Sequence, residues 1–478
     1  MSRPNFTLSS VLSTLVVFCL AASLPLIADS HVRIVRLSFI AGGVQISNSS
    51  GQHQNAIVNQ PIAEGMNLRT SDDGRAEVEF EDGSTLRLVP DSAVDFPQLA
   101  LQDSGVKLST IVVTRGTAYV NFVGTKDNNF ALAFGNERVS LEHQAHLRID
   151  LEENGSSLAV FKGLVEVNGP SGSVEVKKKQ TVAFEATGNG QYKVAKNVQE
   201  EPWDEWDDQQ NEYHTRYAMK SYNDYSPFAY GTTDLAYYGD FFNYPGYGMM
   251  WQPFFCGAGW DPFMNGAWSF YPGFGYSWVS AYPWGWTPFH YGSWAFLPGR
   301  GWAWQPGGAW HPVYTQLTVV NAPRGFVLPH APASAMGNRT VFVSRGTVSS
   351  FAGDKLVVRN NSAGLGVPRG QFGNMAKLSH KVETHGMVSQ RVNAPVGMGP
   401  NAGMMGRNPN ARMGHMGSNP ASARPGSSAR TPTAAQRSSG MSGGSRPSGM
   451  SAPSPRMSMP SAPSGGGPRG GGGAPQHH

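Results

Sequence analysis

The tryptophans of this chain are the residues whose type and spacing most clearly suggest a binding function. Ten tryptophans lie between Tyr244 and Trp310, and Asp261 and Arg300 are the only formal charges among them. Indole rings exposed on one side of a sheet can stack on cell-wall sugars or lie at a membrane interface. The simpler interpretation is that the rings form the core of a thin sheet. The candidates for ligand or partner binding are Trp260, Trp268, Trp278, Trp286, Trp294 and Trp304.

Motifs for catalysis, metals or nucleotides are absent from the sequence. It contains no Gly-x-Ser-x-Gly elbow, no His-Glu-x-x-His and no paired cysteine motif, and no glycine-rich loop joins an apolar strand to a helix. Asp261 is the only carboxylate of the aromatic region, which disfavours a two-carboxylate glycosidase. His290 aligns with Met264, which argues against a repeated metal ligand, and His143 and His146 are interpreted as surface or edge residues of a strand. We therefore expect no enzyme activity, cofactor or metal site.

The tryptophans belong to an internal repeat. One phrase occurs three times, at 241–251, 268–278 and 294–304, each time with a central Pro-Gly pair, and the period is 26 or 27 residues. The Pro-Gly pair suits a turn that needs a positive φ, and its flanks alternate as strands do. Because a lone hairpin is marginally stable, consecutive units should share a face. The sequence therefore predicts a β-meander of hairpins over residues 241–312.

The first residues have the features of an export signal. An apolar run from Val11 to Ala28 precedes a small-x-small site, so residues 1–30 are expected to be a cleaved signal peptide, with a retained membrane anchor as the alternative. Lipidation of Cys19 is disfavoured by the large Phe18 before it. Cleavage would leave Cys256 as the only cysteine, so no intramolecular disulfide is expected.

Residues 31–197 alternate with period two. In Arg75–Glu81, Ala76, Val78 and Phe80 share one face and three glutamates the other, which is typical of a half-buried strand. A two-residue turn at Asp82-Gly83 would mix charged and apolar faces. A three-residue loop over 81–83 instead pairs Val78 with Leu86 and Ala76 with Leu88, with Gly83 left-handed. The phrase recurs in degraded form at Arg138–Ile149, at an offset of 61, and we predict an all-β domain.

Several phrases of this region resemble the FecR domain of Gram-negative bacteria. The resemblance covers about Val32 to Phe184 and implies an envelope-located β domain that senses or holds a partner. Members that gave the family its name relay a signal to a sigma factor through a segment before their membrane span; only about ten residues precede the apolar run here, so we do not expect that activity. The matching phrases are Asn59–Ile62, Gly65–Thr70, Gly74–Phe80, Asp82–Leu88 and Gly163–Val167. The aromatic repeats that follow resemble an uncharacterised tyrosine- and tryptophan-rich envelope region.

A junction follows at residues 200–220. Aromatic residues at steps of three and four predict an amphipathic helix that docks on a neighbouring domain, with Pro202 in its first turn and its acidic run facing solvent. Residues 313–385 hold short apolar segments, at 318–320, 340–343 and 355–358, that either add edge strands to the meander or stay loosely ordered. Residues 376–385 suit one short helix.

The end of the chain, residues 386–478, is rich in Gly, Pro, Ser, Met and Arg and is predicted to be disordered. No acidic residue follows Glu383, while nine arginines do, so an anionic surface or polymer is the expected partner, without specific nucleic-acid recognition. Its irregularly spaced methionines disfavour a Cu(I) site.

Together these features predict a mainly β protein. It comprises a FecR-like all-β domain, a short linking helix, an aromatic hairpin meander and a disordered tail. We expect a non-enzymatic scaffold or sensor in the periplasm or envelope of a Gram-negative-type bacterium, and not a direct sigma-factor regulator. Its partner would be an envelope protein or a cell-wall glycan. The alternative function is a wall- or polysaccharide-binding module that uses exposed tryptophans.

Overall fold

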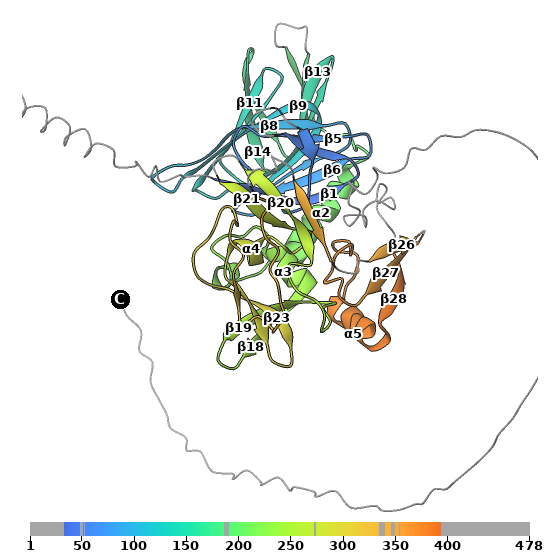
Figure 1. The fold of residues 1–478 in the computed structure, drawn as a ribbon. Helices are drawn as coiled ribbons and strands as arrows, with labels where there is room; N and C mark the ends of the chain where they lie inside the picture. The colour runs from blue at the N-terminus through green and yellow to red at the C-terminus, as the bar shows by residue number, and fades with distance from the viewer. Residues whose placement is uncertain are drawn as a thin grey trace, which may run out of the picture. The chain divides into compact units, whose positions relative to one another are not determined.

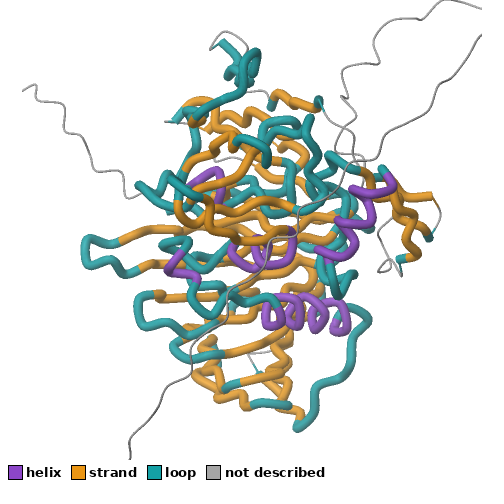
Figure 2. Tube along the Cα trace, turned by 90° about the horizontal axis from the view of Figure 1, so that it is seen from below, coloured by secondary structure: helices purple, strands orange, loops and turns teal. Residues whose placement is uncertain are grey.

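The computed structural model describes residues 33–47, 51, 53–185, 191–271, 274–333, 340–345, 349–352 and 354–392. The predicted signal peptide and residues 393–478 of the predicted tail lie outside the described residues. The described part is mainly β, as the sequence predicted (Figures 1 and 2). None of its helices is long and apolar enough to cross a membrane.

The N-terminal region is a two-sheet assembly of 17 strands. Its strands are β1 (Val35–Ala41), β2 (Val44–Ser47), β3 (His53–Asn55), β4 (Pro61–Ile62), β5 (Asn67–Thr70), β6 (Arg75–Glu79), β7 (Thr85–Leu88), β8 (Ala93–Leu101), β9 (Lys107–Phe122), β10 (Asn128–Phe134), β11 (Glu137–Leu141), β12 (Ala145–Glu152), β13 (Gly155–Lys162), β14 (Leu164–Gly169), β15 (Gly172–Lys177), β16 (Gln180–Glu185) and β17 (Tyr192–Ala195).

Hydrogen-bond pairing divides these strands between two sheets. The first runs β3-β2-β5-β8-β9-β10-β11-β14-β15. The second runs β4-β1-β6-β7-β9-β12-β13-β16-β17. The long strand β9 belongs to both, and it changes sheet at Gly116, whose φ is +71°. A Cβ there would lie 2.6 Å from the Asp91 carbonyl oxygen, so this corner favours glycine. The side chains between the sheets form one aliphatic and aromatic core.

The β6–β7 hairpin has the predicted three-residue loop. Val78 pairs with Leu86 and Ala76 with Leu88, and the Phe80 amide donates to the Ser84 carbonyl at 2.8 Å. Gly83 has a φ of +86°. The degraded copy does not form an equivalent hairpin, because β11 pairs with β10 and β14 while β12 pairs with β9 and β13.

The helices connect and cover the sheets. They are α2 (Asp204–Arg216), the 3-10 turn η1 (Tyr222–Asp224), α3 (Thr232–Tyr238), α4 (Thr287–His290) and α5 (Met375–His385). The predicted junction helix is confirmed as α2, although it begins at Asp204, so Pro202 lies before its first turn. Trp206 of α2 packs with Val89 and Tyr119 of the β domain, which confirms the predicted docking. The predicted short helix is confirmed as α5.

The aromatic repeats form three hairpins with Pro-Gly loops. The strands are β18 (Gly239–Tyr244), β19 (Gly248–Pro253), β20 (Asn265–Tyr271), β21 (Gly275–Ser280), β22 (Ser293–Leu297) and β23 (Gly301–Gln305). Gly246 and Gly299 of the first and third loops have positive φ, as predicted, while Gly273 of the second lies outside the described residues.

The prediction of a meander is wrong. The first and third hairpins share one sheet, joined where Trp251 pairs with Trp304, whereas the second hairpin lies in a separate sheet with β25 (Val341–Ser344). The physical reason lies in the indoles: Trp251, Trp278, Trp284 and Trp294 belong to one buried cluster, and packing on two separate sheets covers rings that a single thin sheet would expose.

Two of the three later short segments become edge strands, which is one of the two predicted roles. β24 (Val319–Val320) pairs with β22 and β25 pairs with β20, so two of them extend the repeat sheets. The third is neither an edge strand of the repeats nor loosely ordered, since it forms a small separate sheet made of β26 (Ser350–Ala352), β27 (Lys355–Arg359) and β28 (Met387–Arg391), beside α5. The prediction of a disordered tail from residue 386 is wrong for β28, because its backbone pairs with β27.

Candidate functional site

The three alternating glutamates of the β6 hairpin face protein and not solvent. The exposed fractions of Glu77, Glu79 and Glu81 are 0%, 1% and 6%. The prediction of a half-buried strand is therefore wrong, since both faces of β6 are covered. An unpaired buried carboxylate is strongly unfavourable, so each of these groups requires a partner. Arg33 pairs with Glu81 at 2.7 Å, while the partners of Glu77 and Glu79 come from several distant segments.

Arg36 of β1 lies at the centre of the buried polar contacts. Its guanidinium is 3.0 Å from a Glu79 oxygen and 2.6 Å from an Asp234 oxygen of α3. It also donates to the Asn59 side-chain oxygen at 3.0 Å and to the Pro283 carbonyl at 2.6 Å. One fully buried cation thus joins the β domain to the repeat region.

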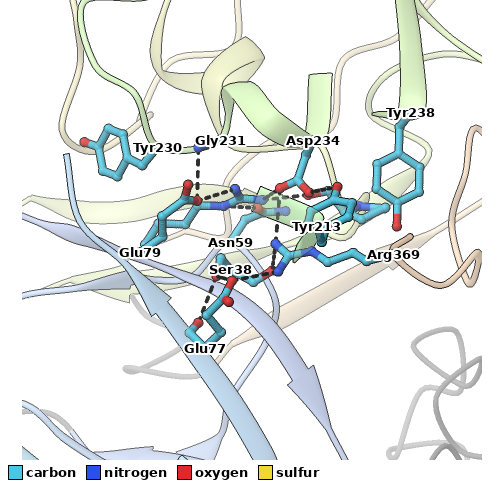
Figure 3. Close-up of polar contacts among 12 residues, drawn as sticks. Ser38, Asn59, Glu77, Glu79, Tyr213, Tyr230, Gly231, Asp234, Tyr238 and Arg369 are labelled. Atoms are coloured by element: carbon cyan, nitrogen blue, oxygen red, sulfur yellow. Dashed lines mark hydrogen bonds and ion pairs between the residues drawn. The ribbon is translucent and has the colours of Figure 1, made fainter. Parts of the chain in front are cut away.

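Arg369, from the loop before α5, reaches the same group of carboxylates (Figure 3). It donates to Glu77 at 2.7 Å and to Asp234 at 3.2 Å. It also donates to the Ser38 carbonyl at 2.7 Å. Asp234 also accepts from the Tyr213 hydroxyl of α2 at 2.6 Å, so α2, α3 and the Arg369 loop meet at one carboxylate.

A third arginine, Arg87 of β7, connects this group to α2. Its guanidinium lies 2.8 Å from Glu77 and 2.6 Å from Asp207. Asp207 is 1% exposed and also lies 2.6 Å from His146 Nε2. The acidic run of α2 was predicted to face solvent, which is wrong for Asp207. His146 is buried in β12 and is not a surface residue, whereas His143 is exposed in the preceding loop.

We name this group the charge cluster. It consists of Arg36, Arg87, Arg369, Glu77, Glu79, Asp207 and Asp234, with His146 and His214 at its margin. His214 Nε2 is 3.0 Å from Glu77. Four carboxylates face three arginines and two histidines. Glu79 differs from the other carboxylates, because burial raises its pKa despite the nearby Arg36.

The other carboxylates of the cluster remain ionised. Burial alone would raise the pKa of Glu77, but the charges of His214, Arg369 and Arg87 outweigh burial and hold the pKa well below its usual range. The pKa of Asp234 is lowered in the same way, since Arg369 and Arg36 outweigh its burial. These paired carboxylates orient the segments that carry them, and all four already have arginine partners. Arg87 Nη2 is buried without a hydrogen-bond partner among the described residues.

A cavity adjoins the charge cluster. Its volume is about 350 Å³, and its walls come from β1 and β2, from the end of α3 and from residues 365–369. Arg369 belongs both to the cavity wall and to the charge cluster. Tyr238 of α3 also lines the cavity and donates its hydroxyl to the Val367 carbonyl at 2.8 Å.

The six candidate tryptophans are all buried. The exposed fractions of Trp260, Trp268, Trp278, Trp286, Trp294 and Trp304 are 3% or less. Five of them lie in the aromatic core of the repeats, while Trp286 packs with Ile34 and Tyr230. The core interpretation therefore describes the rings, and the exposed face that sugar stacking requires is missing from them.

One group of side chains has the composition of a metal site. His146, Asp207 and Asp208 present ligand atoms within 4.8 Å of one another. Arg87 and His146 already occupy the oxygens of Asp207 at 2.6 Å each, and a guanidinium beside a bound cation is unfavourable. We assign no metal to these residues.

The sequence contained only part of the signal for this site. Glutamate on every second position of Arg75–Glu81 was visible, but it is equally typical of a solvent-facing strand. Arg36, Asp234 and Arg369 are isolated in sequence, and no pattern connects them. Their roles appear only when the segments are brought together.

Comparisons with known proteins agree with the two-part organisation. Residues 66–166 match the FecR protein family, and residues 232–333 match a family of unknown function, DUF6600. No curated protein matches the chain.

Two crystal structures of a proposed anti-sigma factor from Parabacteroides distasonis, at 2.50 Å and 1.65 Å resolution, show 16% and 17% identity and a TM-score of 0.24. The match covers 27% of this chain and 59% of each of those chains, and it is too weak to transfer a function. The FecR match supports a sensing or regulatory protein of the cell envelope. The chain carries a FecR domain followed by a DUF6600 region.

Proposed function

We propose that this protein is a non-enzymatic sensor or scaffold of the cell envelope in which the FecR domain and the DUF6600 region respond as one unit. The observation that carries the proposal is Asp234. This DUF6600 carboxylate is buried between Arg36, at 2.6 Å, and Arg369, at 3.2 Å. A change in position of either region would leave buried charges unpaired, which costs several kcal/mol, of the order of 3–5.

The contacts around Asp234 support a non-enzymatic role. Each carboxylate of the charge cluster is paired with at least one arginine, so none of them is available as a general acid or base. Among the described residues that line the cavity there is no carboxylate, histidine or cysteine. These contacts suit a site that holds the FecR domain and the DUF6600 region together and passes a conformational change from one to the other.

The protein would act in the periplasm or envelope, with another envelope component as its partner and an anionic surface or polymer as the partner of the basic tail. We assign it no direct contact with a sigma factor. Fractionation of the native host tests the location: we expect the full chain in the periplasmic or membrane fraction, and recovery in the cytosol contradicts the proposal. Copurification of a sigma factor would contradict the expectation that the protein makes no direct contact with one.

Calorimetry of the full chain tests the coupling. We expect one cooperative unfolding transition for the natural chain and two separate transitions for Asp234→Asn, because that variant removes the shared partner of Arg36 and Arg369. The matched control is Asp224→Asn, at an exposed residue of η1, which should keep the single transition. Two transitions in the natural chain would show that the regions unfold independently and would refute the coupling.

A further inference from the structure

The cavity beside the charge cluster has the size and composition of a ligand site. Its volume of about 350 Å³ falls in the range of small-molecule pockets, roughly 300–1,000 Å³. The side chains that form most of the wall are apolar: Phe39, Ile40, Val58, Tyr238, Leu365 and Val367. Gly42, Gly43 and Asn55 also line it and are exposed, so the cavity opens to solvent at the β1–β2 turn.

The wall formed by residues 365–369 is anchored through the two residues that precede it. The Trp284 indole donates to the Ala363 carbonyl at 2.7 Å, and the Ala363 amide donates to the Phe255 carbonyl at 3.2 Å. Gly364 has a φ of +81°, and a Cβ at this position would lie 2.8 Å from the Tyr238 ring. The cavity is therefore preformed, which keeps the ordering cost of binding low.

The charges around the cavity restrict the chemistry of its occupant. Arg369 is the only charged residue among the described lining residues, and Glu77, Asp234 and the Ser38 carbonyl already accept its hydrogen bonds. An anionic ligand would have to compete with two buried carboxylates for this guanidinium, and a cationic ligand would find no free carboxylate in the wall. The occupant that remains is neutral and apolar, held by burial of its surface.

We propose that this cavity binds a small neutral apolar molecule and is the sensory site of the protein. The inference rests on the proposed function, since it names the ligand class to which the coupled unit responds. Binding would be communicated through Arg369, because the same side chain contacts the cavity and holds Glu77 and Asp234. Binding would also be communicated through Tyr238, whose hydroxyl donates to the Val367 carbonyl in the cavity wall.

The test uses the full chain without detergent and two dyes of similar size. N-phenyl-1-naphthylamine is neutral, and 1-anilinonaphthalene-8-sulfonate carries a negative charge. We expect saturable one-to-one binding of the neutral dye. Val58 and Ala281 both line the cavity, and a tryptophan at either position would fill part of it. In Val58→Trp and Ala281→Trp the affinity should therefore fall by about tenfold or more, which corresponds to about 1.4 kcal/mol of binding free energy.

The control is Val123→Trp, at a residue that is 39% exposed and does not line the cavity. Its affinity for the neutral dye should equal that of the natural chain. Absence of saturable binding, equal binding in all variants, or displacement of the neutral dye by the anionic dye at similar concentration would each overturn the inference. The calorimetric test of coupling needs no ligand, so a chain that shows one transition but no dye binding refutes the cavity site alone.

Discussion

Arg369 donates a hydrogen bond to Glu77 across 2.7 Å, although 292 residues separate them in the chain. Glu77 also accepts a hydrogen bond from Arg87 at 2.8 Å and lies 3.0 Å from His214. One carboxylate of the FecR domain thus contacts a strand of its own domain, the junction helix and a loop that follows the DUF6600 region. The positive charges at these contacts lower the pKa of Glu77.

The two central glutamates should differ in their contribution to stability. Glu77→Gln leaves Arg87 and Arg369 short of a buried anion, and we expect it to cost on the order of 3–5 kcal/mol of unfolding free energy. Glu79→Gln should cost clearly less, because burial raises the pKa of Glu79 and its partner Arg36 keeps Asp234. Urea unfolding at pH 7 measures both. Equal losses would show that the pairing does not distinguish these carboxylates.

The acidic side of α2 offers a neighbouring pair of variants. Asp207 is buried between Arg87 and His146, whereas the next residue, Asp208, is exposed. We expect Asp207→Asn to cost about 3 kcal/mol, since it leaves a buried guanidinium underpaired, and Asp208→Asn to stay within about 0.5 kcal/mol. Thermal unfolding of the two variants tests the docking of α2. Similar effects would mean that the Asp207 pairing does not hold the helix in place.

His290 should make stability depend on pH. Burial against Trp286 is the main cause that lowers its pKa from 6.5 to about 4. The unfolded chain takes up a proton below about pH 6.5, while the folded chain does not until about pH 4. The His290 contribution is therefore complete above pH 6.5 and declines toward pH 4, by about 3 kcal/mol over the window.

The measurement is the urea midpoint between pH 7 and pH 4.5. We expect His290→Gln to flatten the decline, and His143→Gln, at an exposed loop residue, to leave it unchanged. A decline that persists in full in His290→Gln would assign it to other groups.

Glycine and tryptophan twelve residues apart recur as packed pairs in the three repeats. A Cβ would lie 2.3 Å from the Trp251 ring at Gly239, 2.4 Å from the Trp278 ring at Gly266, and 2.6 Å from the Trp304 ring at Gly292. We therefore expect Gly266→Ala to cost about 1–3 kcal/mol through overpacking. Gly373→Ala, where nothing lies within 4 Å, is the control and should be near neutral. A neutral Gly266→Ala would contradict the tight packing of the repeat.

Local rules were sufficient for several elements. The parity of apolar residues in Arg75–Glu81 predicted the three-residue loop, because only that register keeps Val78 opposite Leu86. The Pro-Gly pairs predicted the three hairpins, and the three-and-four spacing of aromatic residues predicted α2. These properties depend on residues that are close in sequence, so the sequence alone carries them.

The sequence by itself determined the β class of the chain, its hairpins and its repeat, since backbone geometry and side-chain alternation act over a few residues. Only the tertiary structure decided that the glutamate face of β6 is buried, that the second hairpin leaves the sheet of the other two, and that the tryptophans face each other. An alternating glutamate is identical in sequence whether it faces water or an arginine. The arginines that settle the matter, Arg36 and Arg369, are placed by contacts between distant segments.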